Sequence, residues 1–502
     1  MEVDSLLDRN EKTQYQIFQQ FALQHVPLNI QDLLKQVEGS KQYLTSQLEA
    51  LKYKTARHPE LVWTKQALGE VLEIDPAFNV TDFYFEFLAG SLNYQLLLEL
   101  YQKDQLDPPT VMTQFYLSES SYYRRIKELN QVLAEFNLKI KRGRLQGNES
   151  QIRYFFIQLF FGATPFKQLV AENIDPDIKN LLQIIQTRLK TRFKPFEYQR
   201  FFLILRVTKR RLASGQRGAT QNLQALVPAL IKEKSYQAIR EIFFRYVSRY
   251  SFAWDETEIV LLYLFVHSFA IIPYNSDFFA ATYESFEQQR LLADPKAPIN
   301  QLNQMTLAFF DRFLVSKNFS EHDQQIKKYS ILQLNLYLLY FEGAYVYFDR
   351  TSMFELESLV PGQNIKRESI ALVAACYELL DKPFDRHGSK EATLFMRLSV
   401  LLTYFLRKYR QKVYIGVDHH SDELMRETLL LYLQDTLQSE GIYVEEAKSG
   451  KVYDLLLTNS DIVTPTIAAD ELFVLTDIAS DKEISQIKQL IQEKFVKTKG
   501  SE

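Results

Sequence analysis

The sequence predicts a mainly α fold divided into several domains and closed by a small α/β domain. A chain of 502 residues is too long for a single hydrophobic core. Hydrophobic residues make up 46% of it and charged residues 24%, with only 15 Gly and 15 Pro, which is typical of folded, helix-rich modules. Apolar residues recur at helical spacing over most of the chain, whereas short apolar runs near the C-terminus indicate buried strands.

The segment 92–136 is predicted to form helices separated by a tight turn. Helical spacing indicates a helix over 92–103 and, after the break at 107–109, a short helix over 110–116. A longer helix then runs to the end of the segment. Ser118 is its predicted N-cap, because a serine hydroxyl can accept a hydrogen bond from an amide of the first turn.

The longer helix has one apolar face and one polar face. The apolar residues recur at spacings of 4, 3 and 4 and are expected to face the core: Tyr122, Ile126, Leu129 and Leu133. The opposite face carries Ser120, Ser121, Tyr123, Arg124, Lys127 and Glu128. Residues 137–147 then alternate apolar with basic residues around a turn at Arg142-Gly143, which predicts a basic β-hairpin, or wing. Seven basic and three acidic residues lie between Ser118 and Gln146.

A weaker copy of this pattern lies 78 positions earlier. The matched positions are Ser40 and Ser118, Leu44 and Tyr122, Leu48 and Ile126, Leu51 and Leu129, Leu33 and Val111, and Val37 and Phe115. Because the repeat covers both helices, we predict two winged helix-turn-helix units, over residues 1–75 and 76–149.

This geometry implies contact with double-stranded DNA. A helix can enter the major groove when the preceding helix braces it against the phosphates, and a wing adds phosphate contacts beside it. Lysine and arginine are expected mostly on phosphates, with Ser120 or Tyr123 near base edges. The predicted contacts are Ser120, Tyr123, Arg124, Arg125, Lys127, Lys141 and Arg142 in the second unit, and Lys41, Gln42 and Thr45 in the first.

A structural alternative stays open for both units, because helical hairpins with solvated polar faces also occur without any DNA-binding role. It is stronger for the first unit, whose exposed helix positions carry little net charge: Lys41, Gln42, Thr45, Ser46 and Glu49. The first unit is therefore expected either to read DNA or only to brace the second.

The string LSESSYYRRIKELNQVLAEFNLKIKRGRLQGNESQIRYFFIQLFF, from Leu117 to Phe161, resembles the distal helix-turn-helix and linker of the Mga/AtxA-type virulence regulators of Gram-positive bacteria. It is also similar to related regulators that carry PTS-regulation domains. The resemblance implies two helical PTS-regulation-like domains, over 150–285 and 286–410, and a domain similar to enzyme IIB of the sugar phosphotransferase system over 411–502. It further implies a transcriptional activator that forms a homodimer or a higher oligomer, through the C-terminal or the second helical domain.

The resemblance also implies regulation by phosphate. PTS-regulation domains are phosphorylated on histidine by phosphocarrier proteins, which adds charge at a helical interface. The candidates are His267 and His387, with His322 ranked below them. His267 lies in an apolar stretch, so a core histidine is the alternative there, whereas His387 lies in a loop-like stretch.

A strongly basic interval covers residues 188–217, where ten basic residues stand against one acidic residue, Glu197. It includes Lys209-Arg210-Arg211. Such an interval could bind DNA or phosphate, but a solvated surface is the favoured interpretation.

Three apolar runs at the C-terminus, over 412–417, 452–458 and 472–476, are predicted strands. With helices over 423–438 and 482–495 they predict a small, mainly parallel α/β domain. In cysteine-type enzyme IIB domains the nucleophile follows the first strand, but no cysteine stands there in this chain, which argues against phosphotransfer catalysis. His419-His420 could hold a metal or accept phosphate, yet an ordinary loop is favoured because no further ligand stands at a suitable spacing.

The sequence gives no indication of an enzyme, a cofactor or a membrane protein. It contains no P-loop, no G-x-S-x-G, no H-E-x-x-H and no G-x-G-x-x-G after a strand, so no catalytic, cofactor or metal residues are predicted. The single cysteine, Cys376, and the lack of a secretory signal favour a reducing cytoplasm. The most apolar run, 259–274, is too short to span a bilayer and is predicted to be a buried helix.

Two rival functions stay open. An RNA-binding antiterminator shares the regulatory domains, but those proteins begin with a small β-rich RNA module, whereas helices are expected here. A pure interaction scaffold would use the 37 Phe and 29 Tyr for assembly only and would show no salt-dependent affinity for DNA.

Overall fold

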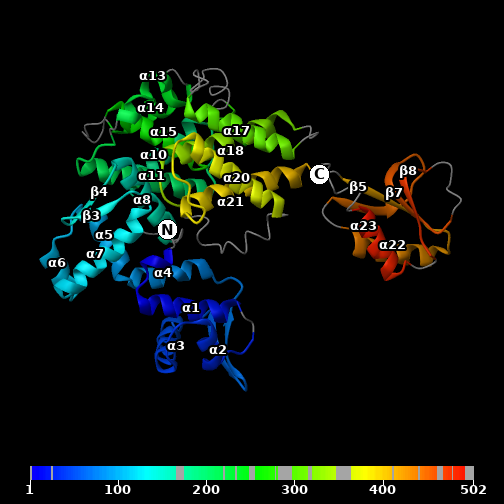
Figure 1. Cartoon of the computed structure of the whole chain (residues 1–502), viewed down its shortest axis with the longest axis horizontal. Helices are drawn as coiled ribbons and strands as arrows, with labels where there is room; N and C mark the ends of the chain where they lie inside the picture. Colours follow the sequence, from blue (N-terminus) through cyan, green and yellow to red (C-terminus); the bar gives the residue numbers. More distant parts are fainter. Residues whose placement is uncertain are drawn as a thin grey trace. The chain divides into compact units, whose positions relative to one another are not determined.

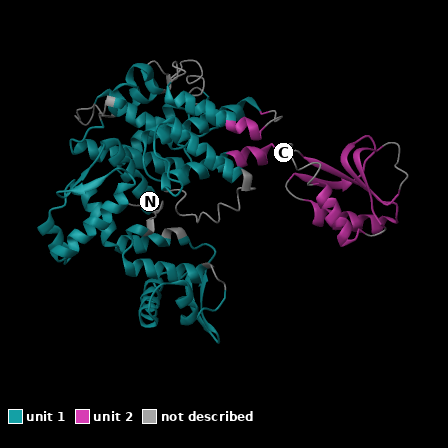
Figure 2. Ribbon diagram, viewed as in Figure 1, with its two compact units in different colours: residues 1–308, 320–401 teal, residues 309–319, 402–502 magenta. Residues whose placement is uncertain are grey.

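The computed structural model describes residues 3–23, 26–164, 175–218, 221–231, 234–247, 255–277, 279–280, 297–314, 319–345, 363–409, 412–438, 441–460, 467–476 and 479–491. The chain divides into two compact units (Figure 2). The larger comprises Met1–Ala308 and Ser320–Leu401, and the smaller comprises Phe309–Phe319 and Leu402–Glu502. Within the described ranges, no helix has the length and apolar character needed to cross a membrane.

The larger unit begins with an N-terminal base, η1 (Val3–Leu6) and α1 (Arg9–Leu23), which precedes the first helix-turn-helix. The elements of that helix-turn-helix are α2 (Ile30–Gln36), α3 (Lys41–Thr55), and the hairpin of β1 (Leu61–Gln66) and β2 (Gly69–Ile74). Helix α1 packs against α3 and against the next helix, α4 (Val80–Gly90). Phe18 and Phe21 fill this core, with Phe18 against Phe83 and Phe21 edge-on to Trp63.

The second helix-turn-helix follows directly. Its elements are α5 (Leu92–Lys103), α6 (Pro108–Gln114), α7 (Glu119–Ala134), and the hairpin of β3 (Lys139–Lys141) and β4 (Arg144–Gln146) (Figure 1). The predicted order of helices, turn and wing is confirmed. Helices α2 and α6, and also the first residues of α3 and α7, stand 78 positions apart, so the repeat extends to the element boundaries.

The rest of the larger unit is helical. Its elements are α8 (Glu149–Ala163), α10 (Pro176–Arg188), α11 (Pro195–Ala213), α12 (Gln221–Gln224), α13 (Val227–Leu230), α14 (Lys234–Val247), α15 (Glu256–Ser268), α18 (Glu321–Tyr340), α20 (Gln363–Leu379), and most of α17 (Pro298–Phe313) and α21 (Ser389–Lys408). Helix α15 is buried from Thr257 to Ser268, which confirms the buried helix predicted for the apolar run that overlaps it from residue 259 onward. It packs against α14 and α18, while α8 packs against α11.

The smaller unit holds a parallel four-stranded sheet in the order β6-β5-β7-β8. Its elements are β5 (Val413–Asp418), α22 (Glu423–Leu437), β6 (Ile442–Glu446), β7 (Val452–Thr458), β8 (Ala468–Val474) and α23 (Asp481–Ile491). Helices α22 and α23 lie on one face of the sheet and share its apolar core (Figure 1). The predicted parallel α/β architecture is confirmed, and β6 is an additional strand.

Candidate nucleic-acid interface

The second helix-turn-helix begins each of its two helices with a side-chain cap. Asp107 accepts a hydrogen bond from the amide of Thr110 at 3.2 Å, and Pro108 starts α6 where no amide partner is needed. Ser118 accepts from the amide of Ser121 at 3.2 Å, which confirms the predicted start of α7. The turn between the helices exposes 96% of Tyr116, a residue held at a φ of +52°.

Helix α7 separates its faces as its sequence pattern predicts. Of the four residues predicted to face the core, Tyr122, Leu129 and Leu133 are buried and Ile126 is half-buried. Ser120, Tyr123, Arg124 and Lys127 are exposed, and Arg124 keeps 67% of its side chain in solvent beside a loose 3.8 Å contact with Glu128. Positions three and four apart on a helix share a face, so Ser120, Tyr123, Arg124 and Lys127 form one polar and basic strip.

Arg125 stands apart from that strip. Its side chain is only 21% exposed, and it forms ion pairs with Asp8 at 2.7 Å and with Glu128 at 3.0 Å. Asp8 precedes α1 and also accepts a hydrogen bond from the amide of Leu92 at 3.0 Å. The structure therefore gives Arg125 a bracing contact to the N-terminal base, while its contact with DNA stays a prediction.

The second wing is a tight hairpin fixed to the body of the unit. Arg142 and Gly143 both have positive φ, +52° and +71°, as a two-residue type I′ turn requires. A Cβ on Gly143 would lie 2.1 Å from the carbonyl oxygen of Leu106, so only glycine fits. Lys139, Lys141 and Arg142 are exposed. Arg144 is exposed as well, but it donates twice to Gln105, at 3.0 and 2.9 Å.

Asn130 joins the wing to helix α7. Its amide group donates to the carbonyl of Ile140 at 3.1 Å and its carbonyl accepts from the amide of Ile140 at 2.5 Å. Both backbone groups of a strand residue are thereby satisfied by one side chain. The sequence pattern did not predict this role of Asn130, because a side-chain partner ten residues away cannot be read from a helical pattern. It also did not predict that Tyr116 is an exposed turn residue with positive φ, because helical spacing says nothing about the φ of a turn.

The first helix-turn-helix repeats the same frame. Asn29 caps α2 in a capping box with Asp32, and Ser40 caps α3 by accepting from the amide of Tyr43 at 3.2 Å. Leu28 exchanges two backbone hydrogen bonds with Glu70 of the first wing, and at the equivalent position Leu106 donates one to the carbonyl of Gly143 in the second wing. Trp63 donates to Thr55 at 2.8 Å and so ties the first wing to α3.

The predicted contacts of the first unit are exposed, but they carry little charge. Lys41, Gln42 and Thr45 all lie on the solvent side of α3, and the hydroxyl of Thr45 donates back to the carbonyl of Lys41 at 2.8 Å. Lys52 is ion-paired with Glu49 at 2.9 Å and with Glu70 at 2.8 Å. The first unit therefore presents a near-neutral surface, whereas the second presents a basic one.

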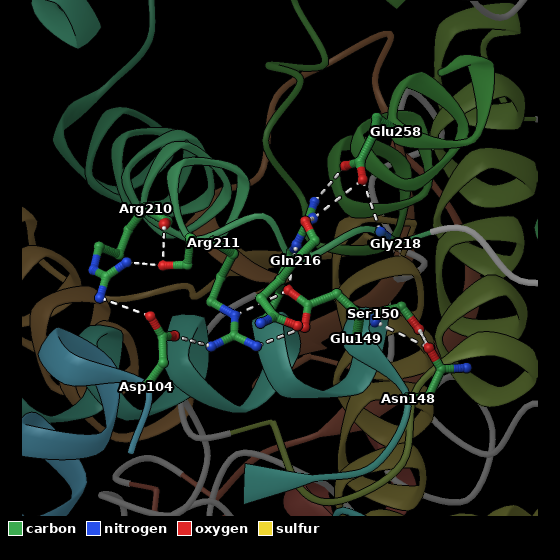
Figure 3. A network of polar contacts seen from close by, with 11 residues as sticks. Asp104, Asn148, Glu149, Ser150, Arg210, Arg211, Gln216, Gly218 and Glu258 are labelled. Atoms are coloured by element: carbon green, nitrogen blue, oxygen red, sulfur yellow. Dashed lines mark hydrogen bonds and ion pairs between the residues drawn. The ribbon is translucent and has the colours of Figure 1, made fainter. Parts of the chain in front are cut away.

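The basic interval 188–217 is a solvated surface only in part. Five of its cations are exposed, as expected: Arg188, Lys190, Arg192, Lys194 and Arg206. The expectation is wrong for the last part of α11. Lys209 contacts Asp175 and, at 3.0 Å, Asp177. Arg210 and Arg211 both pair with Asp104, at 2.9 and 2.6 Å (Figure 3). These cations are neutralised within the protein, because the carboxylates that face them come from distant segments that a local charge count cannot see. They are not available for phosphate in this conformation.

The histidine candidates differ sharply in accessibility. His267 is completely buried in α15, its Nδ1 lies 2.8 Å from the hydroxyl of Tyr329, and burial lowers its pKa to about 3. A phosphocarrier cannot reach this ring unless α15 and α18 separate. His387 is exposed in the turn before α21, where its amide donates to Asp385 at 2.9 Å. His322 is exposed in the first turn of α18. Phosphorylation at any of them stays a prediction.

The His419-His420 loop follows β5 in the smaller unit. Nδ1 of His419 lies 2.9 Å from the hydroxyl of Ser421, and the amide of His420 donates to Asn459 at 2.7 Å. In the part of the chain that the structure describes, no group of three or more His, Cys, Asp or Glu side chains is placed to hold a metal ion. The hydrogen bonds of the loop are those of an ordered connection.

Comparison with known proteins supports the assignment suggested by this geometry. Residues 76–160 match the Mga helix-turn-helix domain, and residues 179–269 match the PRD domain. The chain therefore combines a helix-turn-helix domain with a PRD domain, and the resemblance to Mga-type regulators that carry PTS-regulation domains is confirmed.

A similar protein from Streptococcus pneumoniae serotype 4 is described as a putative trans-acting regulator. It is 26% identical over 132 residues, which are 25% of this chain and 27% of that protein. The alignment thus spans about a quarter of the relative's length.

Proposed function

We propose that this protein is a DNA-binding transcriptional regulator, acting as an activator, and that its second helix-turn-helix makes the principal contact with DNA. One observation carries the proposal: the exposed strip of Ser120, Tyr123, Arg124 and Lys127 stands on a capped helix whose wing presents Lys141 and Arg142. Cations on both a recognition helix and its wing suit the two phosphate strands that flank a major groove.

The remaining parts of the proposal rest on the resemblance to Mga-type regulators. The helical region would comprise two PTS-regulation domains, over 150–285 and 286–410, and residues 411–502 an enzyme IIB-like domain without catalytic activity. Phosphocarrier proteins would phosphorylate an accessible histidine, for which the exposed His387 is better placed than the buried His267. The protein would act in the cytoplasm as a homodimer or a higher oligomer, since one recognition helix reads only a few base pairs.

The test is fluorescence-anisotropy binding to a bent, A·T-rich duplex over a series of salt concentrations. The Arg124→Ala/Lys127→Ala variant should bind more weakly than wild type. Loss of two phosphate contacts should flatten the slope of log K against log salt by about 1.8.

A matched control removes two exposed cations of α10, as Lys179→Ala/Arg188→Ala. It should leave the slope unchanged. If the slope flattens in this control instead, the surface of α10 in the helical region contributes to the binding. If wild type itself shows no salt-dependent affinity, the scaffold function replaces the proposal.

A further inference from the structure

A chain of alternating charges leads from the second helix-turn-helix into the PRD-matching helices. It starts at Asp104, the C-cap of α5, which adopts a left-handed conformation with φ of +60°. The Asp104 carboxylate accepts from Arg210 at 2.9 Å and from Arg211 at 2.6 Å, both in the last turn of α11 (Figure 3).

The second link reaches the start of α8. Arg211 donates to both carboxylate oxygens of Glu149, from Nε at 3.0 Å and from Nη2 at 2.7 Å. This two-point contact fixes the orientation of the pair as well as its distance. Glu149 is the first residue of α8, directly after the N-cap of that helix and three residues after the second wing ends. Arg211 therefore contacts the second helix-turn-helix at the end of its first helix, at Asp104, and the chain just after its wing, at Glu149.

The third link reaches α15. Arg153 lies one turn beyond Glu149, donates to it at 3.0 Å, and donates to the two carboxylate oxygens of Glu258 at 2.5 and 3.2 Å. The side chains of Arg153 and Glu258 are 1% and 0% exposed. Glu258 also accepts from the amide of Gly218 at 2.7 Å. The pKa of Arg153 is raised, because Glu258 and Glu149 outweigh the opposing effect of burial.

The arrangement couples its members. It contains three carboxylates and three guanidinium groups, and Arg211, Glu149 and Arg153 each contact two partners of opposite charge. When one member of a buried ion pair is lost, the other is left as an uncompensated charge and must find a new partner. A change at Glu258 is therefore expected to move Arg153, then Glu149 and Arg211, and finally Asp104.

Helix α15 is well placed to start such a change. Glu258 stands in its first turn, and His267, near its last residue, contacts Tyr329 of α18. A rearrangement that moves α15 against α18 would displace the helix that anchors the charge chain.

We propose that the chain Asp104–Arg211–Glu149–Arg153–Glu258 positions the second helix-turn-helix and transmits displacements of α15 to its DNA-contacting surface. Arg211 and Glu149 are positioning residues in this scheme. The DNA arm of the test rests on the proposed function, but the coupling itself is a property of the protein alone.

The first experiment compares Glu258→Gln with Glu256→Gln in the full-length protein. Glu256 is the matched control, because it lies in the same turn of α15 and pairs with Arg240 of α14 at 2.6 Å, outside the charge chain. By amide hydrogen exchange, Glu258→Gln should accelerate exchange about tenfold at Leu106 and around residues 149–153, and Glu256→Gln should not. DNA affinity should change at least about fivefold in Glu258→Gln only.

The second experiment tests the coupling in the reverse direction with Asp104→Asn. The Asp104 side chain is 25% exposed, so this variant is expected to fold even if Glu258→Gln does not. It should accelerate exchange at the amide of Gly218. In the double variant Asp104→Asn/Glu258→Gln, the acceleration of amide exchange should be clearly smaller than the product of the accelerations in the two single variants. The reason is that each single variant already releases the same chain of ion pairs.

Two results would overturn the inference. One is faster exchange that stays confined to the mutated element in both single variants. The other is an acceleration in the double variant that comes within about twofold of the product of the two single accelerations. If wild type does not bind DNA, the proposed function fails, and the exchange measurements still decide whether the coupling exists.

Discussion

The two helix-turn-helix units share one frame and differ in the surface built on it. In both, an Asn or Asp caps the short helix and a serine caps the long helix, at positions 29 and 40 in the first unit and 107 and 118 in the second. In both, the residue before the first cap, Leu28 or Leu106, pairs with the wing. The frame is therefore set by the caps, the apolar spacing and the residue that contacts the wing, whose positions recur 78 residues apart.

The charges do not recur. Between Ser40 and Ile74 five basic residues face four acidic ones, whereas seven face three between Ser118 and Gln146. The turn of the first wing carries the exposed Leu68, whereas the turn of the second wing is formed by Arg142 and Gly143. Fold and electrostatic function are thus specified by different residues, and the second unit alone combines a basic helix with a basic wing.

The largest effect should come from the shared core. Leu51→Ala and Leu129→Ala remove fully buried side chains at equivalent positions, so each should lower the free energy of unfolding of its own unit by about 2–5 kcal/mol. Calorimetry of the full-length variants, with transitions assigned by hydrogen exchange, measures both losses. A large loss in one variant and none in the other would show that the two units do not share a core design.

The second wing offers the next test. Gly143→Ala combines a positive φ with a Cβ 2.1 Å from the Leu106 carbonyl, so it should destabilise the wing by about 1–3 kcal/mol and weaken DNA binding. Gly215→Ala is the control for backbone strain alone, because its φ is +75° and no atom lies within 4 Å of the added Cβ. Equal losses in the two variants would remove the argument for close packing at the wing.

The ties between wing and helix should differ between the units. Asn130→Ala leaves both backbone groups of Ile140 without their side-chain partner and should cost about 1–3 kcal/mol, with faster amide exchange at Ile140. Trp63→Phe removes one bond to Thr55 and should cost about 0.5–1.5 kcal/mol. A larger loss of stability in Trp63→Phe than in Asn130→Ala would contradict this expected difference between the units.

The smallest effect concerns the caps. Ser40→Ala and Ser118→Ala should each destabilise their helix by about 1 kcal/mol, and the matching Ser→Asp variants should restore it, because aspartate caps as well as serine. Thermal unfolding followed by circular dichroism measures both pairs. A loss that Ser→Asp does not recover would mean that the serines act otherwise than as caps.

Local features of the fold could be predicted from the sequence, and contacts between distant segments could not. The Ser118 cap, the faces of α7 and the wing depend on residues a few positions apart, and all of them are confirmed. The bracing of Arg125 by Asp8 and of Arg211 by Asp104 joins residues more than a hundred positions apart, beyond any local charge count. Strand β6 was missed because Ile442–Glu446 is short and half exposed.

The central claim is that the second unit carries the electrostatic contact with DNA, and the salt dependence of binding tests it most directly. Two variants each remove one exposed cation from a long helix and one from its wing: Lys41→Ala/Lys65→Ala in the first unit and Lys127→Ala/Arg142→Ala in the second. We expect the slope of log K against log salt to flatten by about 1.8 in the second-unit variant and by less than about half of that in the first. Equal flattening, or flattening confined to the first-unit variant, would contradict the account.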